Sequence, residues 1–436
     1  MRKITIIGGG LAGCEAALYL ADNGWEITLF EMRPNQMTPA HHTGNLAEVV
    51  CSNSFKSKLI ETSSGLLKAE MKLLGSKLLE MAELHAVPAG NALAIDREEF
   101  SKHVTRQVEE HPLITVVREE VKQIPQPPVI LATGPLTSDT LAESLQSAIG
   151  LDQLYFFDAI APIVSTDSLD HSVLFSKTRY DKGDADYLNC PLNKEEYYSF
   201  VDALKASEKH EAKEFENRFF HDLEFKFYEN CMPIEEIARR GEESLRFGVM
   251  RPVGLEDPRT GKRAYAILQL RAENLDKTSY NLVGCQTMMK YGEQKRIFSM
   301  LPGFANAEFM RYGSIHRNTY LNGPEIMDEK FSLKSMPGVY IAGQLAGVEG
   351  YVESIMSGLL VAKVLNENLQ MLPEETMSGQ LWRHLVLEKD MPFQPMNANF
   401  GILPGIIQEK KNKAQKKEML ASRAMQAMEE FIRNHS

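Results

Sequence analysis

The sequence predicts an α/β protein built on a Rossmann-like dinucleotide-binding domain, into which an α+β domain is inserted. Three observations predict this fold. A glycine-rich turn separates an apolar run from a helix at the N-terminus, similar glycine-rich segments recur late in the chain, and the stretch between them has a different composition. With 436 residues, the chain is long enough for two or three domains.

Composition and charge limit the class of protein. Hydrophobic residues make up 43% of the chain, yet no apolar run is long enough to span a membrane. The apolar run near the N-terminus breaks into glycines after four residues, which argues against a signal peptide. Five cysteines without a CxxC pair or zinc-type spacing favour a reducing, cytosolic compartment. With a net charge of −11, binding of nucleic acid would require a local basic patch.

The first element is a strand over Ile4–Ile7, followed by the turn "GGGLAG" and a helix. Gly8, Gly10 and Gly13 match the pattern G-x-G-x-x-G. The first allows a tight turn, the second admits a pyrophosphate and the third packs helix against strand. The phosphates would lie at the helix N-terminus, where free N–H groups attract anions. The turn also contains the candidate contacts Gly9, Leu11 and Ala12.

The second strand, "WEITLFE", ends in Glu31, which is placed to bond a ribose hydroxyl and is followed by Met32. An acid at this position favours an unphosphorylated ribose, and therefore FAD or NAD. The alternative is a glycine turn without a ligand. The combination of strand, helix and terminal acid disfavours that alternative.

Two later segments favour FAD. "PPVILATGP", from Pro127, is a buried strand ending in Ala-Thr-Gly, and the segment from Met336 is a strand, a glycine turn and a long helix. Both resemble segments of flavoproteins of the two-dinucleotide-binding-fold type, in which the last helix points at the flavin and its dipole stabilises the anionic reduced form. A plain βα unit is the alternative, which the density of glycines disfavours. The candidate contacts are Thr133, Gly134, Gly343, Gln344, Gly347, Gly350 and Tyr351.

The FAD-binding domain is therefore predicted in two parts, residues 1–183 and 314–436, around an α+β insertion domain at 184–313. The insertion begins with a charged helical stretch, in which Asn193 and Glu196 fit a capping box. "AYAILQLRAEN" and "SYNLVGCQT" are predicted to form an antiparallel pair of strands. The C-terminal part is predicted to end in a helix with a basic first half.

Two cysteines are predicted at helix entrances. Cys51, in "VVCSNSFKS", is expected just before a helix, with lysines nearby. Cys231, in "YENCMPIEEIARRG", is expected before a helix that has Pro233 in its first turn and ends before Gly241. Helix N-termini and cations stabilise thiolates. The residues alone leave open whether these two thiols react or pack. Packing is favoured for the other three, Cys14, Cys190 and Cys285.

Six segments together resemble one family: "GGGLAGCEAA", "VVCSNSFKS", "ENCMPIEEIARRG", "RFGVMRPVGL", "GSIHRNTYLNGP" and "GQLAGVEGYVESIMSG". This family is the bacterial folate- and FAD-dependent tRNA (uracil-5-)-methyltransferases, and the resemblance runs from Ile4 to about Pro404. A related, longer family that modifies the tRNA wobble uridine shares the cysteine segment less well. This chain looks too short for that longer family.

The resemblance implies transfer of the methylene of 5,10-methylenetetrahydrofolate to carbon 5 of the T-loop uridine of tRNA. FAD would carry the methylene and then reducing equivalents, NADPH or NADH would re-reduce the flavin, and 5-methyluridine would be the product. A thiolate added to carbon 6 makes carbon 5 nucleophilic, and a base must then remove the carbon 5 proton. We assign Cys231 as the nucleophile and Cys51 as the base or a group assisting at the flavin, with the reverse assignment left open.

The resemblance also indicates substrate contacts. His316 would stack on the pterin of the folate, with Arg317 and Asn318 nearby, although each could equally serve the fold alone. A flipped target nucleotide is expected. Basic residues between Glu409 and Arg423 form either a solvated helix face or an RNA contact. The arginines best placed for tRNA phosphates are Arg239, Arg240, Arg246 and Arg251.

Three other functions compete with this hypothesis. The same flavin and folate chemistry could act on a ribosomal RNA uridine. A flavin oxidoreductase acting on small molecules would need neither the paired cysteines nor the arginine cluster. A flavin-containing RNA-binding scaffold would bind RNA without turnover. We favour the tRNA enzyme.

Overall fold

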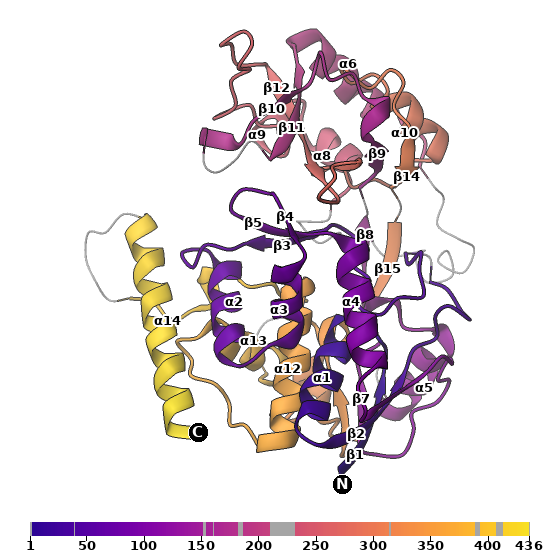
Figure 1. Ribbon diagram of the computed structural model, residues 1–436, viewed down its shortest axis with the longest axis vertical. Coiled ribbons are helices and arrows are strands. Elements are labelled where there is room, and N and C mark those ends of the chain that lie inside the picture. Colours follow the sequence, from indigo (N-terminus) through magenta and orange to yellow (C-terminus); the bar gives the residue numbers. More distant parts are fainter. Residues whose placement is uncertain are drawn as a thin grey trace.

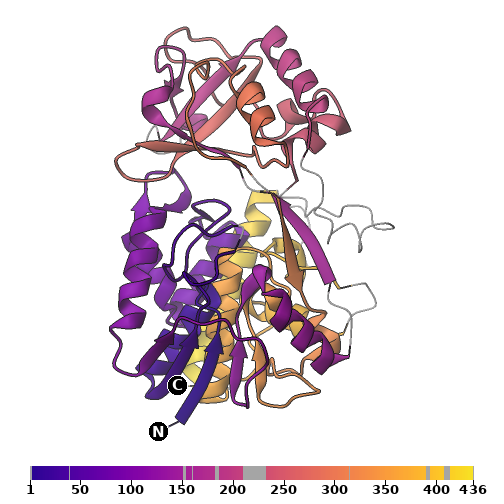
Figure 2. The same ribbon diagram turned by 90° about the vertical axis from the view of Figure 1, so that its right-hand side faces the viewer.

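The computed structural model describes residues 2–38, 40–150, 154–159, 161–181, 186–209, 232–313, 315–388, 393–406 and 413–435. Two units are stacked along the long axis of the molecule, and both termini lie on the lower one (Figure 1). A ribbon of two antiparallel strands, β8 (Leu154–Ala159) and β15 (Ile315–Tyr320), lies where the chain passes between the units (Figure 2). We call the lower part the dinucleotide unit and the upper part the insertion unit.

A five-stranded parallel sheet forms the centre of the dinucleotide unit, in the order β16-β7-β1-β2-β6. Its inner strands are rich in buried Ile, Val and Leu, as expected where helices cover both faces of a parallel sheet. The predicted strands at both ends of the sequence therefore join one sheet. The bounds are β1 (Arg2–Ile7), β2 (Trp25–Phe30), β6 (Ile114–Val117), β7 (Val129–Leu131) and β16 (Val339–Ile341).

Two central helices, α1 (Leu11–Asp22) and α12 (Tyr351–Glu367), pack directly against each other. Contact is close because Gly358 has no side chain: a Cβ there would lie 2.2 Å from the Ala12 carbonyl oxygen. The two predicted strand–turn–helix segments are thus confirmed and meet in space. The other helices of this unit are α2 (Ser63–Leu73), α3 (Lys77–Leu84), α4 (Arg97–Glu109), α5 (Asp139–Ile149), α11 (Gly323–Ile326), α13 (Met377–Val386) and α14 (Lys413–His435).

The helix predicted immediately after Cys51 is wrong. Ser54–Ser57 form strand β3, which pairs with β5 (Ala92–Ile95) in a small antiparallel sheet completed by β4 (Ala86–Val87). The serines form local turns instead of capping a helix, because Ser54 N–H bonds the Ser52 hydroxyl and Lys56 N–H bonds the Ser54 hydroxyl. The next helix, α2, begins only at Ser63.

A six-stranded sheet forms the insertion unit, in the order β10-β11-β12-β13-β9-β14. The predicted pairing of β12 with β13 is confirmed as antiparallel, and the predicted capping box at Asn193 and Glu196 starts α6. The strands are β9 (Ile163–Ser165), β10 (Phe175–Ser176), β11 (Tyr187–Leu192), β12 (Ala266–Ala272), β13 (Ser279–Leu282) and β14 (Phe309–Arg311). The helices are α6 (Lys194–Lys205), α8 (Ile234–Arg240), α9 (Ser244–Phe247) and α10 (Tyr291–Phe298).

The predicted domain boundary between residues 183 and 184 falls inside this antiparallel sheet. β9 and β10 precede it and pair with strands that follow it. These strands are only three and two residues long, which is too short for a periodic sequence pattern. We propose a division by sheet membership, with the insertion unit spanning Ile163 to Arg311. Among the residues that the structure describes, no helix has the length and apolar character needed to cross a membrane.

Glu70 of α2 is a fully buried carboxylate that caps α13. It accepts hydrogen bonds from the N–H groups of Met377 and Ser378, both at 2.8 Å, and from the Ser378 hydroxyl at 2.6 Å. Burial raises the pKa of Glu70 from 4.5 to about 7, although these hydrogen bonds oppose the shift. Between pH 4.5 and about 7, the folded protein therefore keeps a proton on Glu70 that the unfolded chain releases.

Replacing Glu70 by glutamine is expected to remove a pH dependence of stability between pH 4.5 and about 7. In this window the folded state binds more protons than the unfolded state, so the contribution of Glu70 to the free energy of unfolding falls as pH rises. The shift corresponds to on the order of 3 kcal/mol. Urea unfolding at several pH values measures it. The free energy of unfolding of the variant should rise relative to that of the parent as pH rises. A difference in this free energy that does not change with pH contradicts the prediction.

Candidate active site

A pocket opens at the carboxyl-terminal edge of the parallel sheet, which is where ligands bind in folds of this type. Three stretches far apart in the sequence line it, within residues 7–50, 119–141 and 343–354. Most of the predicted cofactor contacts therefore come together. Those that line the pocket are Gly8, Gly10, Leu11, Ala12, Glu31, Met32, Thr133, Gly134, Gly343, Gln344 and Tyr351.

The three glycines of the N-terminal turn have distinct surroundings. Gly8 has φ +105°, and a Cβ on it would lie 2.4 Å from the Ala132 carbonyl oxygen. A Cβ on Gly13 would lie 1.9 Å from the Gly8 carbonyl oxygen. A Cβ on Gly10 would meet nothing within 4 Å. Gly8 and Gly13 are thus needed for close packing, whereas Gly10 keeps open the space in front of α1.

The remaining predicted glycines, Gly9, Gly13, Gly347 and Gly350, are not part of the described pocket lining. Three of them shape the wall from behind. Gly9 N–H donates to Glu31 Oε2 at 2.9 Å. A Cβ on Gly347 would strike the Phe393 ring, and one on Gly350 would strike the buried Glu353 carboxylate.

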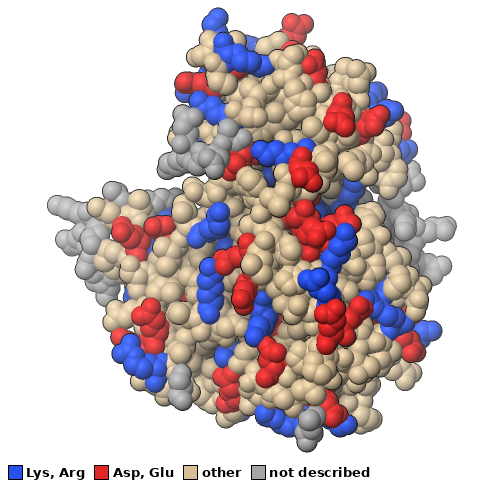
Figure 3. Space-filling view, in the orientation of Figure 1, with Lys and Arg blue, Asp and Glu red and all other residues tan. Residues whose placement is uncertain are grey.

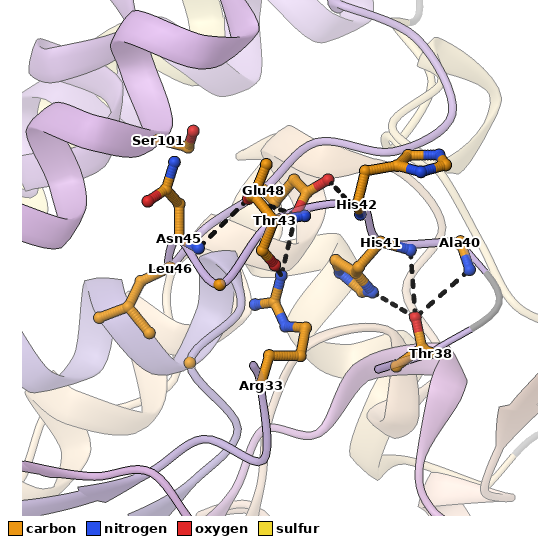
Figure 4. A network of polar contacts seen from close by, with 12 residues as sticks. Arg33, Thr38, Ala40, His41, His42, Thr43, Asn45, Leu46, Glu48 and Ser101 are labelled. Atoms are coloured by element: carbon orange, nitrogen blue, oxygen red, sulfur yellow. Dashed lines mark hydrogen bonds and ion pairs between the residues drawn. The ribbon is translucent and has the colours of Figure 1, made fainter. Parts of the chain in front are cut away.

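Glu31 anchors a buried ionic network at the end of β2. Its Oε1 accepts hydrogen bonds from Arg33 N–H at 3.0 Å and from Arg33 Nε at 2.9 Å. Arg33, only 2% exposed, also bonds Glu48 at 3.1 Å. Figure 4 shows Arg33 pointing toward Glu48 and Thr43, next to the group formed by Thr38 and His41. The paired charges hold the loop after β2 over the pocket.

Two helix N-termini at this pocket fit the phosphates and ring of a dinucleotide. Neither α1 nor α12 has a side-chain cap, so their first N–H groups are left for an anion. Leu11 of α1, and Tyr351 and Ser354 of α12, line the pocket. With the open space at Gly10 and the acid at Glu31, the residues present fit FAD.

Cys51 lies at the junction between this pocket and the insertion unit. Its main-chain N–H donates to the Tyr351 hydroxyl at 2.7 Å, and Ser52 N–H donates to the same oxygen at 3.2 Å. The Tyr351 ring packs against Phe55 with 5.7 Å between centroids. Because Val50 and Tyr351 both line the pocket, the half-buried Cys51 stands beside it. Burial, and then Cys51, raise the pKa of Tyr351, so its hydroxyl stays protonated at neutral pH.

Two arginines place positive charge at this junction, where the sequence predicted a helix N-terminus. Arg97, the first residue of α4, donates to the two carbonyls just before Cys51. Burial, and then Arg97, lower the pKa of Arg311 of β14, whereas Tyr351 and Cys51 act in the opposite direction. Arg311 Nη2 donates to the carbonyl of Ala40, in the loop after β2, at 3.3 Å. Arg97 therefore brings a guanidinium, which keeps its charge at working pH, to the main chain next to Cys51.

The other four cysteines divide into two groups. Cys14, Cys190 and Cys285 are buried, and burial raises the pKa of each thiol, as expected for cysteines that pack. Cys231 lies outside the described residues, so its predicted role stays a prediction. The helix predicted after it is confirmed as α8, which starts at Ile234 and is followed by Gly241.

The three predicted folate contacts lie on one strand. His316, Arg317 and Asn318 are consecutive on β15, paired with Asp158, Phe157 and Phe156 of β8. Their side chains lie outside the described residues, so contact with folate stays a prediction.

The four predicted RNA-binding arginines lie at or after α8, on the insertion unit. Arg239 bonds Glu236, and Arg246 bonds Glu243 and stacks on Tyr265. Internal contacts therefore occupy these two. Arg240 and Arg251 are exposed, and so is Arg239 despite its ion pair.

Several residues of the junction were missed by reasoning from the sequence. Asn53, Arg97 and Arg311 are buried or half-buried polar groups that each have a partner far along the chain. No local pattern indicates such partners. The one available signal was the sequence "CSNSF", in which Asn53 lies two residues after Cys51.

The glycine turn, the acid-ended second strand and the late strand–helix unit define a flavoprotein with a split dinucleotide-binding domain. The family model described as Glucose inhibited division protein A matches residues 3–373 of this chain. The solved structures of Aquifex aeolicus GidA have the same fold: form II aligns with a TM-score of 0.67 at 14% identity, covering 98% of this chain and 73% of that one.

Closer relatives identify the family within this class. The chain is 49% identical over 437 residues to the methylenetetrahydrofolate–tRNA-(uracil-5-)-methyltransferase TrmFO of Desulfitobacterium hafniense, covering 99% of this chain and 98% of that protein. It is 49% identical to the TrmFO of Moorella thermoacetica, covering 97% of each chain, and 47% identical to that of Listeria monocytogenes, covering 98% of each. The chain belongs to the TrmFO family.

Proposed function

We propose that this protein methylates the T-loop uridine of tRNA at carbon 5. The carbon comes from 5,10-methylenetetrahydrofolate, and the reducing equivalents come from NADPH or NADH through FAD. The observation that carries the proposal is the position of Cys51, whose main chain Tyr351 fixes beside the dinucleotide pocket. Membership of the TrmFO family supports the reaction. The free cysteines of the described part support a reducing, cytoplasmic compartment.

The proposed chemistry uses two thiols. A thiolate adds to carbon 6 of uracil, and the electron pair of the 5,6 double bond makes carbon 5 able to attack the methylene. A base then takes the carbon 5 proton, and loss of the thiolate restores the double bond. When bound, reduced FAD would supply the two electrons, as a hydride, that complete the methyl group as the bond between the methylene and the nitrogen that carried it breaks. We assign the addition to Cys231 and the proton transfer, or assistance at the flavin, to Cys51, with the reverse assignment as the alternative.

We propose that the tRNA phosphates are contacted by a few exposed arginines. On the face shown in Figure 3, Lys and Arg lie interspersed with Asp and Glu over both units, without one broad basic surface. Arg239, Arg240 and Arg251 are the exposed members of the predicted cluster, and Arg239 is paired with Glu236. In the C-terminal helix, Arg423 instead bonds the carbonyls of Pro404 and Gly405. Removing Lys or Arg contacts to phosphate weakens binding and its salt dependence.

The proposal is tested with an unmodified tRNA transcript and ribosomal RNA fragments, incubated in parallel with the protein, FAD, NADPH and methylenetetrahydrofolate labelled on its one-carbon unit. Mass spectrometry of nuclease fragments maps the label. Label on the T-loop uridine is the expected result. Label only on ribosomal RNA moves the activity to that substrate, and no label on either, with flavin bound, contradicts the proposal.

Replacing Tyr351 by phenylalanine is expected to slow methylation by about tenfold to a hundredfold. The ring still packs on Phe55, but the Cys51 and Ser52 N–H groups lose their acceptor, at a cost of about 1–3 kcal/mol. Single-turnover methylation with saturating FAD measures the loss. Tyr340→Phe is the control, because this tyrosine of β16 does not line the described pocket. Equal activity of both variants contradicts the prediction.

A further inference from the structure

The segment that contains Cys51 is held by both units of the protein. We call residues Val49 to Asn53 the thiol segment. From the dinucleotide unit, Arg97 Nη1 donates to the carbonyls of Val49 and Val50, both at 3.2 Å. The N–H groups of Cys51 and Ser52 donate to the Tyr351 hydroxyl. These four bonds fix consecutive main-chain groups on either side of the thiol.

The insertion unit holds the same segment through Asn53, which is fully buried. Asn53 Nδ2 donates to the carbonyl of Ile95 at 3.1 Å and to that of Ala272, at the end of β12, at 2.9 Å. Its Oδ1 accepts from Arg271 Nε at 2.7 Å. One amide therefore joins the thiol segment, the small sheet of the dinucleotide unit and the central sheet of the insertion unit.

A second contact between the units lies beside the first. Glu273 forms an ion pair with the same Arg97 that holds the carbonyls before Cys51, with Arg97 Nη2 at 3.2 Å from Glu273 Oε1. Arg271 and Glu273 are two residues apart, and each is 7% exposed. Both reach the dinucleotide unit from the end of β12, Arg271 to Asn53 and Glu273, just after the strand, to Arg97.

We propose that Asn53 and Arg271 are positioning residues, through which the docked insertion unit fixes the thiol of Cys51 for the reaction. This inference rests on the proposed catalytic role of Cys51. In the sequence, Cys231 falls within the range of the insertion unit, so the proposed chemistry requires that thiol and Cys51 to be held in a fixed relation to one base. A displacement of about 1 Å in such a site can cost about a hundredfold in rate. A contact that ties the Cys51 segment to the insertion unit supplies that relation.

Asparagine suits this position because its amide both donates and accepts. Alanine would leave two buried carbonyls and the Arg271 Nε–H without their partner, and aspartate would present an oxygen to the two carbonyls. The main-chain bonds of Cys51 to Tyr351 would remain in either variant. The thiol segment would then lose its direct contacts with the insertion unit and keep only the indirect link through Arg97 and Glu273.

The test uses the intact, FAD-loaded protein and two variants, Asn53→Ala and Arg271→Met. Iodoacetamide is added for increasing times, and the rate of Cys51 alkylation is read by mass spectrometry of its peptide. We expect this rate to rise about threefold or more in both variants, because a segment that has lost contacts with the insertion unit opens more often. We also expect kcat for methylation to fall about tenfold or more, with KM for tRNA nearly unchanged.

Asn189→Ala is the matched control. Asn189 is also fully buried and donates to three carbonyls, but all of them, at Phe175, Lys177 and Tyr187, lie inside the insertion unit. Its loss should lower stability without changing the alkylation of Cys51. The proposal is overturned if Asn53→Ala and Arg271→Met leave the alkylation rate at the parent value, or if Asn189→Ala raises it equally. The alkylation rate does not depend on methylation, so it tests the positioning even if the proposed function fails.

Discussion

Replacing Cys51 by alanine is expected to abolish methylation of tRNA, with a loss of about a thousandfold or more, while FAD stays bound. The structural bond of Cys51 to Tyr351 is made by its main-chain N–H, and alanine keeps it. The variant therefore removes the thiol and little else. Loss of a group that transfers a proton typically costs a factor of about 10² to 10⁴. Methylation of labelled tRNA and the flavin absorbance of the same preparation measure the two effects.

Two outcomes would contradict this expectation. A fully active Cys51→Ala protein would show that the thiol has no chemical role. A protein that has lost its flavin would show that Cys51 serves the pocket and not the reaction. Cys231→Ala is expected to be equally inactive and to keep its flavin, and Cys14→Ala is the control for a buried thiol that packs. If Cys51 removes the proton, the Cys51→Ala variant should still form a covalent adduct with tRNA, which denaturing electrophoresis detects.

Replacing Gly10 by valine is expected to weaken FAD binding strongly without destabilising the fold. A Cβ on Gly10 meets no protein atom within 4 Å, and its backbone, at φ −80° and ψ −171°, is open to any residue. The new side chain would therefore fill the space in front of the uncapped N-terminus of α1, where a pyrophosphate would bind. Flavin content and the affinity of the apoprotein for added FAD should each fall by about tenfold or more.

Two glycines provide the comparison for this variant. Gly292, near the start of α10, also has open space around it but is remote from the pocket, so Gly292→Val should keep FAD. Gly13→Val should destabilise the protein itself, because its Cβ would lie 1.9 Å from the Gly8 carbonyl oxygen. Thermal unfolding of the apoproteins separates these cases. Normal FAD affinity in Gly10→Val would show that no phosphate lies at this turn.

Local sequence was enough to predict the parts of the fold whose signals are contiguous. The glycine turn that starts at Gly8 follows the first strand and leads into a helix, and a second strand comes directly after that helix. The structure confirms both strands and the helix. The capping box at Asn193 and the short helix ending at Gly241 are equally local. In each case the residues that decide the conformation lie within a few positions of one another.

The remaining features depend on partners that the sequence does not place. The serines after Cys51 suit a helix cap and a turn equally well, and only pairing with β5 decides for a strand. Arg33 is buried because Glu31 and Glu48 both reach it, which the charge pattern alone does not indicate. The contacts of Asn53 with β12 join residues more than two hundred positions apart. Most of the pocket was therefore predictable, whereas the environment of the thiol was not.

The split of the dinucleotide unit also determines how the protein is made. Asp22, the last residue of α1, and Tyr351, the first of α12, are 351 − 22 = 329 positions apart. At the usual speed of synthesis, roughly 15 to 65 s pass between them. During that time the apolar face of α1 lacks the helix that covers it, whereas the contiguous insertion unit can pack as soon as it emerges. The nascent N-terminal part is thus a natural client for chaperones, and the flavin can join only a nearly finished chain.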